Sequence, residues 1–237
     1  NGRAQVVLPP IGLSGRVSQT LNCVITNTAA SGSNVPLCTT GNIYVVDGGQ
    51  MKRVLVSGTS GTVSNLGSSA GVELNGLGIA PGGVKAYAFY RDATNANQGR
   101  IYVYNSSTGT WARMSSGSGW DISIASGALV GGAVSPTSTY YSGGFTTGGS
   151  FYLQSMNANG TAMVSNGYLA LDSYDNGDIY FDSDGNLYLT RVKNSSDYRR
   201  TTTYRVAAAD LAAAVGTSNS LPYTVLMPET TLTGEAN

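Results

Sequence analysis

The chain has 237 residues, and 13 basic residues balance 13 acidic ones, so that the formal net charge is zero. Charged residues make up only 11% of the chain, which argues against a general electrostatic attraction to nucleic acid or to an anionic membrane. The absence of histidine excludes Ser-His-Asp catalysis and histidine metal ligation within this chain. No apolar run approaches the roughly 18–20 residues of a membrane-spanning helix, so we expect no membrane insertion.

The first 41 residues are rich in Ser, Thr, Asn and Gly and contain both cysteines, Cys23 and Cys38. We predict an N-terminal segment over 1–41 in which the two cysteines form a disulfide, since no histidine is present to share a metal with them. Closing a loop of this size stabilises a fold by about 3 kcal/mol in the chain-entropy model. A disulfide implies an oxidising, extracytoplasmic compartment, and two free buried cysteines are the alternative.

A strand-and-turn unit recurs along the rest of the chain. Residues 78–88, 132–142 and 178–188 each read as a short apolar strand, a tight polar turn and a second strand with an aromatic residue. A fourth copy is visible only by its second strand, because 41–45 repeats 185–189. The intervals between the units are close to the roughly 40–50 residues of a propeller blade.

Each unit continues into a second hairpin, as in 99–111 and 149–164, where glycine supplies the positive φ of the turn. The sequence therefore predicts an all-β fold, a β-propeller of four-stranded antiparallel blades. About four blades are expected, at 42–66, 72–115, 130–170 and 177–228. Residues 233–237 resemble the approach to the second blade, 71–76, so we expect these blades to belong to a larger ring, with the chain cut or truncated at or near Asn237.

Helix is scarce in this sequence. The alanine-rich stretch 207–214 predicts one short helix, because alanine favours helix and Gly216 favours its end.

The phrase from Tyr204 to Leu211 resembles the linker between outer strands in β-propeller domains of Gram-positive, especially actinobacterial, surface proteins. Residues 77–83 and 182–188 resemble motifs of the same domains, and the resemblance covers about residues 40–237. It implies an exported or wall-attached protein, often an adhesin or a pilus component.

The densest acidic run contains Asp182, Asp184 and Asn186, whose oxygens are of the kind that calcium prefers. The same residues are also typical of a hairpin turn in which Asp and Asn bond their own backbone. A turn and a calcium site are both compatible with this sequence, and the turn is the favoured interpretation.

A basic cluster with an interleaved tyrosine follows, comprising Arg191, Tyr198, Arg199 and Arg200. Arginine makes paired hydrogen bonds to carboxylates, so these residues are candidate ligands for an anionic glycan or a carboxylate. The alternative is that the arginines neutralise the neighbouring acids. Aromatic residues of the strands could stack on sugars, although at strand spacing they more often pack between blades.

No catalytic constellation stands out, so an enzyme is the less favoured hypothesis. We expect an extracellular, secreted or cell-wall-associated propeller that binds a protein or a glycan without catalysis. A glycan-active propeller enzyme and a structural scaffold are the alternatives, and a glycosidase would need only two carboxylates or a tyrosine nucleophile. The remainder of its own propeller, as a second chain or segment, is a further possible partner.

Overall fold

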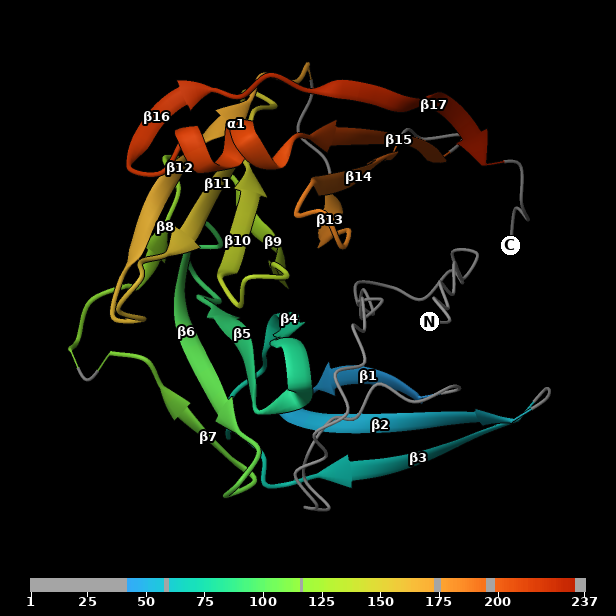
Figure 1. Cartoon of the computed structure of the whole chain (residues 1–237), viewed down its shortest axis with the longest axis vertical. Coiled ribbons are helices and arrows are strands. Elements are labelled where there is room, and N and C mark those ends of the chain that lie inside the picture. Colours follow the sequence, from blue (N-terminus) through green and yellow to red (C-terminus); the bar gives the residue numbers. More distant parts are fainter. Residues whose placement is uncertain (1–41, 58–59, 116, 173–175, 195–198, 233–237) are drawn as a thin grey trace.

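The structure is a computed structural model, and it describes residues 42–57, 60–115, 117–172, 176–194 and 199–232. Four small antiparallel sheets follow one another in a ring-like arrangement around a common centre (Figure 1). This is the architecture of a β-propeller with four blades, and the predicted fold class is confirmed. The predicted disulfide between Cys23 and Cys38, and residues 233–237, lie outside the described residues.

Blade 1 has three strands in the described part of the chain, in the order β1-β2-β3. They are β1 (Asn42–Asp47), β2 (Gln50–Ser57) and β3 (Ser60–Leu66). The strand β1 corresponds to the second strand of the other blades, because residues 41–45 repeat residues 185–189 of blade 4.

Blade 2 is a meander of four strands with an extra short strand at its outer edge. The strands are β4 (Asn75–Ile79), β5 (Lys85–Arg91), β6 (Gln98–Asn105), β7 (Thr110–Arg113) and β8 (Ile122–Ser123). Both β7 and β8 pair with β6, at different positions along it. A 3₁₀ turn (Pro81–Gly83) joins β4 to β5.

Blade 3 contains β9 (Ala128–Val134), β10 (Tyr140–Phe145), β11 (Phe151–Met156) and β12 (Met163–Leu169). A fifth strand, β16 (Thr217–Ser220), adds to β12 in parallel orientation. This strand comes from a later part of the chain and ties blade 4 to the outer edge of blade 3.

Blade 4 contains β13 (Asn176–Phe181), β14 (Leu187–Asn194), β15 (Arg199–Val206) and β17 (Thr224–Leu232). Between β15 and β16 lies the six-residue helix α1 (Ala208–Ala213), which confirms the predicted helix. Within the described residues, no helix is both long enough and apolar enough to cross a bilayer.

The predicted repeat unit is a hairpin of the first two strands in blades 2, 3 and 4. Ile79 pairs with Ala86, Val134 lies opposite Tyr140, and Phe181 lies opposite Leu187. The inner strand β9 packs against both β4 and β13, so that successive blades meet at the centre of the molecule.

In the part of the chain that the structure describes, the core consists of three apolar clusters, each between two successive blades. Phe89, Phe145 and Phe151 are fully buried, and burying a side chain of this size contributes about 1.5–3 kcal/mol. The strand aromatics therefore pack mainly between blades, although Tyr90 and Tyr152 remain half-buried.

Candidate functional site

A pocket of about 560 Å³ opens on the side of blade 4 that faces blade 3. Strands β14, β15 and β17 form its wall, and the segment that follows β12 closes it from blade 3. The residues lining it are Ala170, Leu171, Asp172, Arg191, Thr202, Tyr204, Tyr223, Val225, Pro228 and Glu229.

Arg191 forms the buried polar part of this pocket. Side chains alternate between the two faces of a strand, and Leu187 and Leu189 of β14 point into the core between blades 3 and 4. Arg191 lies two positions further along the same face, directly opposite Thr202 of β15. Its side chain is only 4% exposed, so a full positive charge lies inside an otherwise apolar face.

Asp172 provides a negative charge for this arginine. The Asp172 Oδ1 accepts a 2.6 Å hydrogen bond from Arg191 Nη1, yet the Asp172 side chain is 77% exposed. The guanidinium also lies over the ring of Tyr204, 5.7 Å from its centroid. The buried guanidinium of Arg191 is thus paired with a carboxylate, that of Asp172, which is largely exposed to solvent.

Tyrosines and a second ion pair form the rest of the pocket surface. The ring of Tyr223 meets that of Tyr204 edge to face, with centroids 5.3 Å apart, and its hydroxyl donates a 3.0 Å hydrogen bond to the carbonyl of Ala170. Arg200 of β15 is paired with Glu229 of β17, and Glu229 lines the pocket. The pocket combines aromatic surface with charges of both signs.

The ionisation of Asp172 follows from this geometry. The hydrogen bond from Arg191 lowers the pKa of the Asp172 carboxyl, against a smaller opposing effect of burial. The carboxylate therefore stays charged at neutral pH. A carboxyl group that acts as a general acid near neutral pH would need a raised pKa instead.

The structure brings two of the four predicted ligand-binding residues to this region. Arg191 lines the pocket, and Arg200 pairs with a residue that lines it. Arg199 lies in β15 but its side chain is outside the described residues, as is all of Tyr198. No sequence pattern indicated Tyr223 and Glu229, because β17 pairs with β15 only after the chain has passed through α1 and β16.

The predicted calcium residues form a hairpin turn. Asp182 Oδ1 accepts hydrogen bonds of 2.9 Å from the backbone amides of Asp184 and Asn186. Its Oδ2 accepts 2.8 Å bonds from the side-chain amide of Asn186 and from the hydroxyl of Tyr188. Among the described residues, no group of three or more Asp, Glu, His or Cys side chains could hold a metal ion. The calcium site stays a prediction, while the turn is observed.

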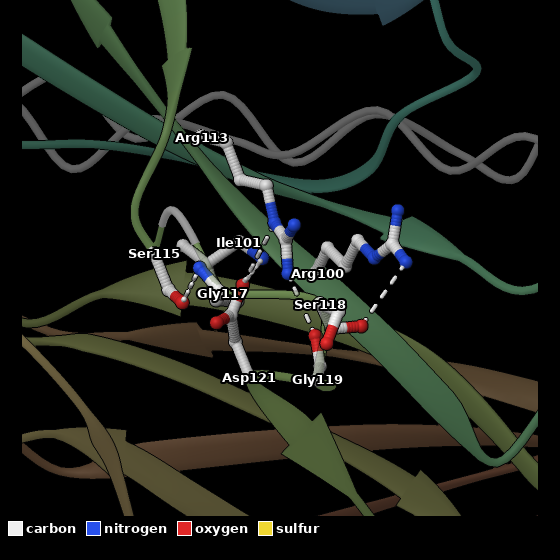
Figure 2. Close-up of polar contacts among 8 residues, drawn as sticks. All are labelled: Arg100, Ile101, Arg113, Ser115, Gly117, Ser118, Gly119 and Asp121. Carbon is white, nitrogen blue, oxygen red and sulfur yellow. Dashed lines mark hydrogen bonds and ion pairs between the residues drawn. The ribbon is translucent and has the colours of Figure 1, made fainter.

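A second basic cluster, which sequence reasoning did not single out, lies at the outer edge of blade 2 (Figure 2). Arg113 Nη2 donates a 2.6 Å hydrogen bond to the carbonyl of Gly119, and the Arg100 guanidinium stacks 4.7 Å from the ring centroid of Trp120. Asp121, whose side chain is 5% exposed, accepts a 2.9 Å bond from the amide of Ile101 and lies 3.9 Å from Arg113. These contacts hold the loop between β7 and β8 against β6.

No protein-family model matches the chain, and no curated protein sequence is similar to it. Among solved structures, TolB from Acinetobacter baumannii is 16% identical with a TM-score of 0.47, over 79% of this chain and 41% of TolB. A luciferin-regenerating enzyme is 12% identical with a TM-score of 0.48, over 81% of this chain and 61% of that one. A chain of a nidogen/laminin complex is 11% identical with a TM-score of 0.44, over 73% of this chain and 74% of that one. This chain therefore spans about half the length of the first two, and at such identities the likeness concerns the fold alone.

Proposed function

We propose that this propeller is a non-catalytic, extracellular binding module of a bacterial surface protein, and that the blade 4 pocket binds an acidic sugar or another carboxylate-bearing ligand. The single observation that carries the binding site is the buried guanidinium of Arg191 at an open, aromatic-lined pocket. The extracellular and Gram-positive assignments rest on the sequence motifs.

Arginine suits this ligand class for a physical reason. Its planar guanidinium can present two N–H donors to one carboxylate, and such charge-assisted bonds are roughly twice as strong as neutral ones. Burial of Arg191 removes competing water, which strengthens the attraction further. Tyr204 and Tyr223 offer ring surface against which a sugar can stack.

Asp172 would act as an internal competitor of the ligand. Its carboxylate already accepts a hydrogen bond from Arg191, and its exposed side chain is free to swing outward when another carboxylate arrives. An incoming acidic ligand must therefore either displace Asp172 or tolerate its charge.

This competition defines the test. N-acetylneuraminic acid, glucuronic acid and galactose would be titrated by calorimetry against the wild type, Asp172→Asn and the matched control Asp184→Asn. Asp184 is an exposed turn residue that does not line the pocket, so its replacement changes the total charge equally. We expect Asp172→Asn to bind at least one acidic sugar several-fold more tightly than the wild type and Asp184→Asn do.

Binding should also weaken with added salt, because screening reduces the attraction between charges. Equal affinity of the three proteins for every acidic sugar, or a preference for galactose, would overturn the proposed ligand class. Arg191→Lys, checked for folding by circular dichroism, keeps the charge but loses the paired donors, and we expect it to bind acidic sugars more weakly.

One observation favours a second candidate, a glycan-active enzyme: Asp172 and Glu229 both line the same pocket, and two carboxylates are what glycoside hydrolysis requires. The lowered pKa of Asp172 fits a nucleophile or base rather than an acid. Release of p-nitrophenol from aryl glycosides by the wild type, abolished in Asp172→Asn, would favour the enzyme over the binding module.

A further inference from the structure

The charges around the blade 4 pocket balance one another. Arg191 is paired with Asp172, and Glu229 is paired with Arg200 of the neighbouring strand. The Asp172 carboxylate is ionised at neutral pH, because the hydrogen bond from Arg191 lowers its pKa. The charged residues that line the pocket are two carboxylates, Asp172 and Glu229, and one guanidinium, Arg191. A ligand that carries only a negative charge therefore adds an uncompensated charge beside two carboxylates.

The two partners in the Arg191–Asp172 ion pair differ in their freedom to move. The Arg191 side chain is buried against the ring of Tyr204, whereas the Asp172 side chain is largely exposed. When a ligand carboxylate takes the hydrogen bond from Arg191, Asp172 has to turn aside and loses its donor. Its charge then lies close to the bound carboxylate. An ammonium group on the same ligand would give Asp172 a new partner and would offset the repulsion between the two carboxylates.

The distances from Arg191 limit where the ligand must carry this ammonium group. Asp172 Oδ1 lies 2.6 Å from Arg191 Nη1. Glu229 is further away along the sheet, because Thr202 of β15 lies directly opposite Arg191 and β17 is the next strand after β15. Two strand spacings separate the backbones of β14 and β17 by roughly 10 Å. An ammonium group that meets Asp172 must therefore lie close to the ligand's own carboxylate.

The rest of the pocket offers apolar surface to the remainder of such a ligand. Leu171, Tyr223, Val225 and Pro228 line the pocket, and the ring of Tyr223 meets that of Tyr204 edge to face. Tyr223 and Val225 are 38% and 48% exposed, so that a ligand side chain packed on them would remove apolar surface from water. A volume of about 560 Å³ lies within the range of small-molecule sites.

We propose that the blade 4 pocket selects a free α-amino acid with an apolar side chain, an inference that rests on the carboxylate-binding function proposed above. Arg191 binds the carboxylate of the amino acid, and Asp172 turns outward to bind its ammonium group. The side chain packs on Tyr223 and Val225. Insertion of the amino acid thus converts one ion pair into a chain of alternating charges, guanidinium, carboxylate, ammonium and carboxylate, and leaves the net charge of the pocket unchanged.

Asp172 therefore has opposite effects on two kinds of ligand. It competes with a ligand that has a carboxylate alone, as argued for acidic sugars, but it assists a ligand that has an ammonium group on the same carbon. Replacing Asp172 with asparagine should weaken the binding of an amino acid and strengthen the binding of the matching acid without the amino group. A general loss of pocket structure would weaken both.

Calorimetric titration with three matched compounds tests this inference. Phenylalanine carries both charges, 3-phenylpropionate carries the carboxylate alone, and phenylalaninamide carries the ammonium group alone. We expect the wild type to bind phenylalanine about tenfold or more tightly than 3-phenylpropionate, because the ammonium group adds a charge-assisted hydrogen bond. In Asp172→Asn this preference should fall to about twofold or less, while the control Asp184→Asn should keep the wild-type preference.

The possible failures separate this inference from the proposed function. Equal binding of phenylalanine and 3-phenylpropionate by the wild type would overturn the selection of an amino acid and leave carboxylate binding in place. An unchanged preference in Asp172→Asn would overturn the role of Asp172. Tighter binding of phenylalaninamide than of phenylalanine would overturn both, since the pocket would then bind cations. Binding of none of the three compounds would overturn this inference, and the titrations with acidic sugars would decide the proposed function separately.

Discussion

The hydroxyl of Tyr140 in blade 3 donates a 2.7 Å hydrogen bond to the backbone carbonyl of Gly76 in blade 2, at full burial. The bond joins two blades through residues that are 64 positions apart in the chain. It also explains why a polar side chain can occupy the centre of an aromatic cluster, because a buried hydroxyl without a partner would destabilise the fold.

Removing this hydroxyl should therefore weaken the interface between blades 2 and 3. We expect Tyr140→Phe to lower the free energy of unfolding by about 1–2 kcal/mol, since the Gly76 carbonyl loses a buried donor. Urea denaturation at neutral pH measures the loss. Tyr152→Phe is the control, because the half-buried Tyr152 stacks on Tyr168 without a hydroxyl hydrogen bond in the described structure. Equal losses in the two variants would contradict the prediction.

The turn at Asp182 should make stability depend on acid pH. Burial raises the pKa of Asp182, but the hydrogen bonds from Asn186 and Tyr188 outweigh this effect, so that the folded pKa lies below the ordinary value of 3.8. The folded state therefore binds a proton less readily than the unfolded state does. The stabilisation is present above about pH 4 and is lost as the pH falls through the folded pKa.

Asp182→Asn tests this dependence, with Asp184→Asn as the control on the same turn. We expect Asp182→Asn to be less stable than the wild type at pH 7 by about 1 kcal/mol or more, because the amide cannot accept all the bonds that the carboxylate accepts. At pH 2.5 the difference should shrink. A difference in urea midpoint that is the same at both pH values would count against the argument.

Asp121 should be important for the outer edge of blade 2. Its nearly buried carboxylate accepts a hydrogen bond from the Ile101 amide and lies close to Arg113 (Figure 2). We expect Asp121→Ala to cost about 2 kcal/mol in unfolding free energy, because the buried Ile101 amide loses its acceptor and the half-buried Arg113 loses its nearby negative charge. Asp210→Ala, at a half-buried position of α1 whose side chain makes no hydrogen bond in the described structure, should cost much less.

A glycine at the bulge of blade 3 should tolerate no side chain. A Cβ at Gly144 would lie 2.2 Å from the carbonyl oxygen of Ala128, which is backbone and cannot move aside without breaking the pairing with β9. We expect Gly144→Ala to destabilise by about 1–3 kcal/mol or to prevent folding. At Gly148, in the next turn, the nearest atom would be 3.8 Å away, so Gly148→Ala should leave the melting temperature nearly unchanged.

Local sequence was sufficient to predict the blades. The alternation of apolar and polar residues, the glycine and aspartate turns and the repeated tyrosine are all encoded within about ten neighbouring residues, and these patterns fix hairpins. The turn at Asp182 and the helix near Asp210 were predictable for the same reason: their hydrogen bonds join residues close in the chain.

The pocket depended on contacts that no local pattern encodes. Arg191 and Asp172 are 19 residues apart, and Tyr223 and Glu229 join them only because β17 pairs with β15 after the chain has passed through α1 and β16. The sequence by itself determined the repeating unit and the residue types available for binding. The tertiary structure decided which charges are buried together, because burial and pairing arise only when blades 3 and 4 pack on each other.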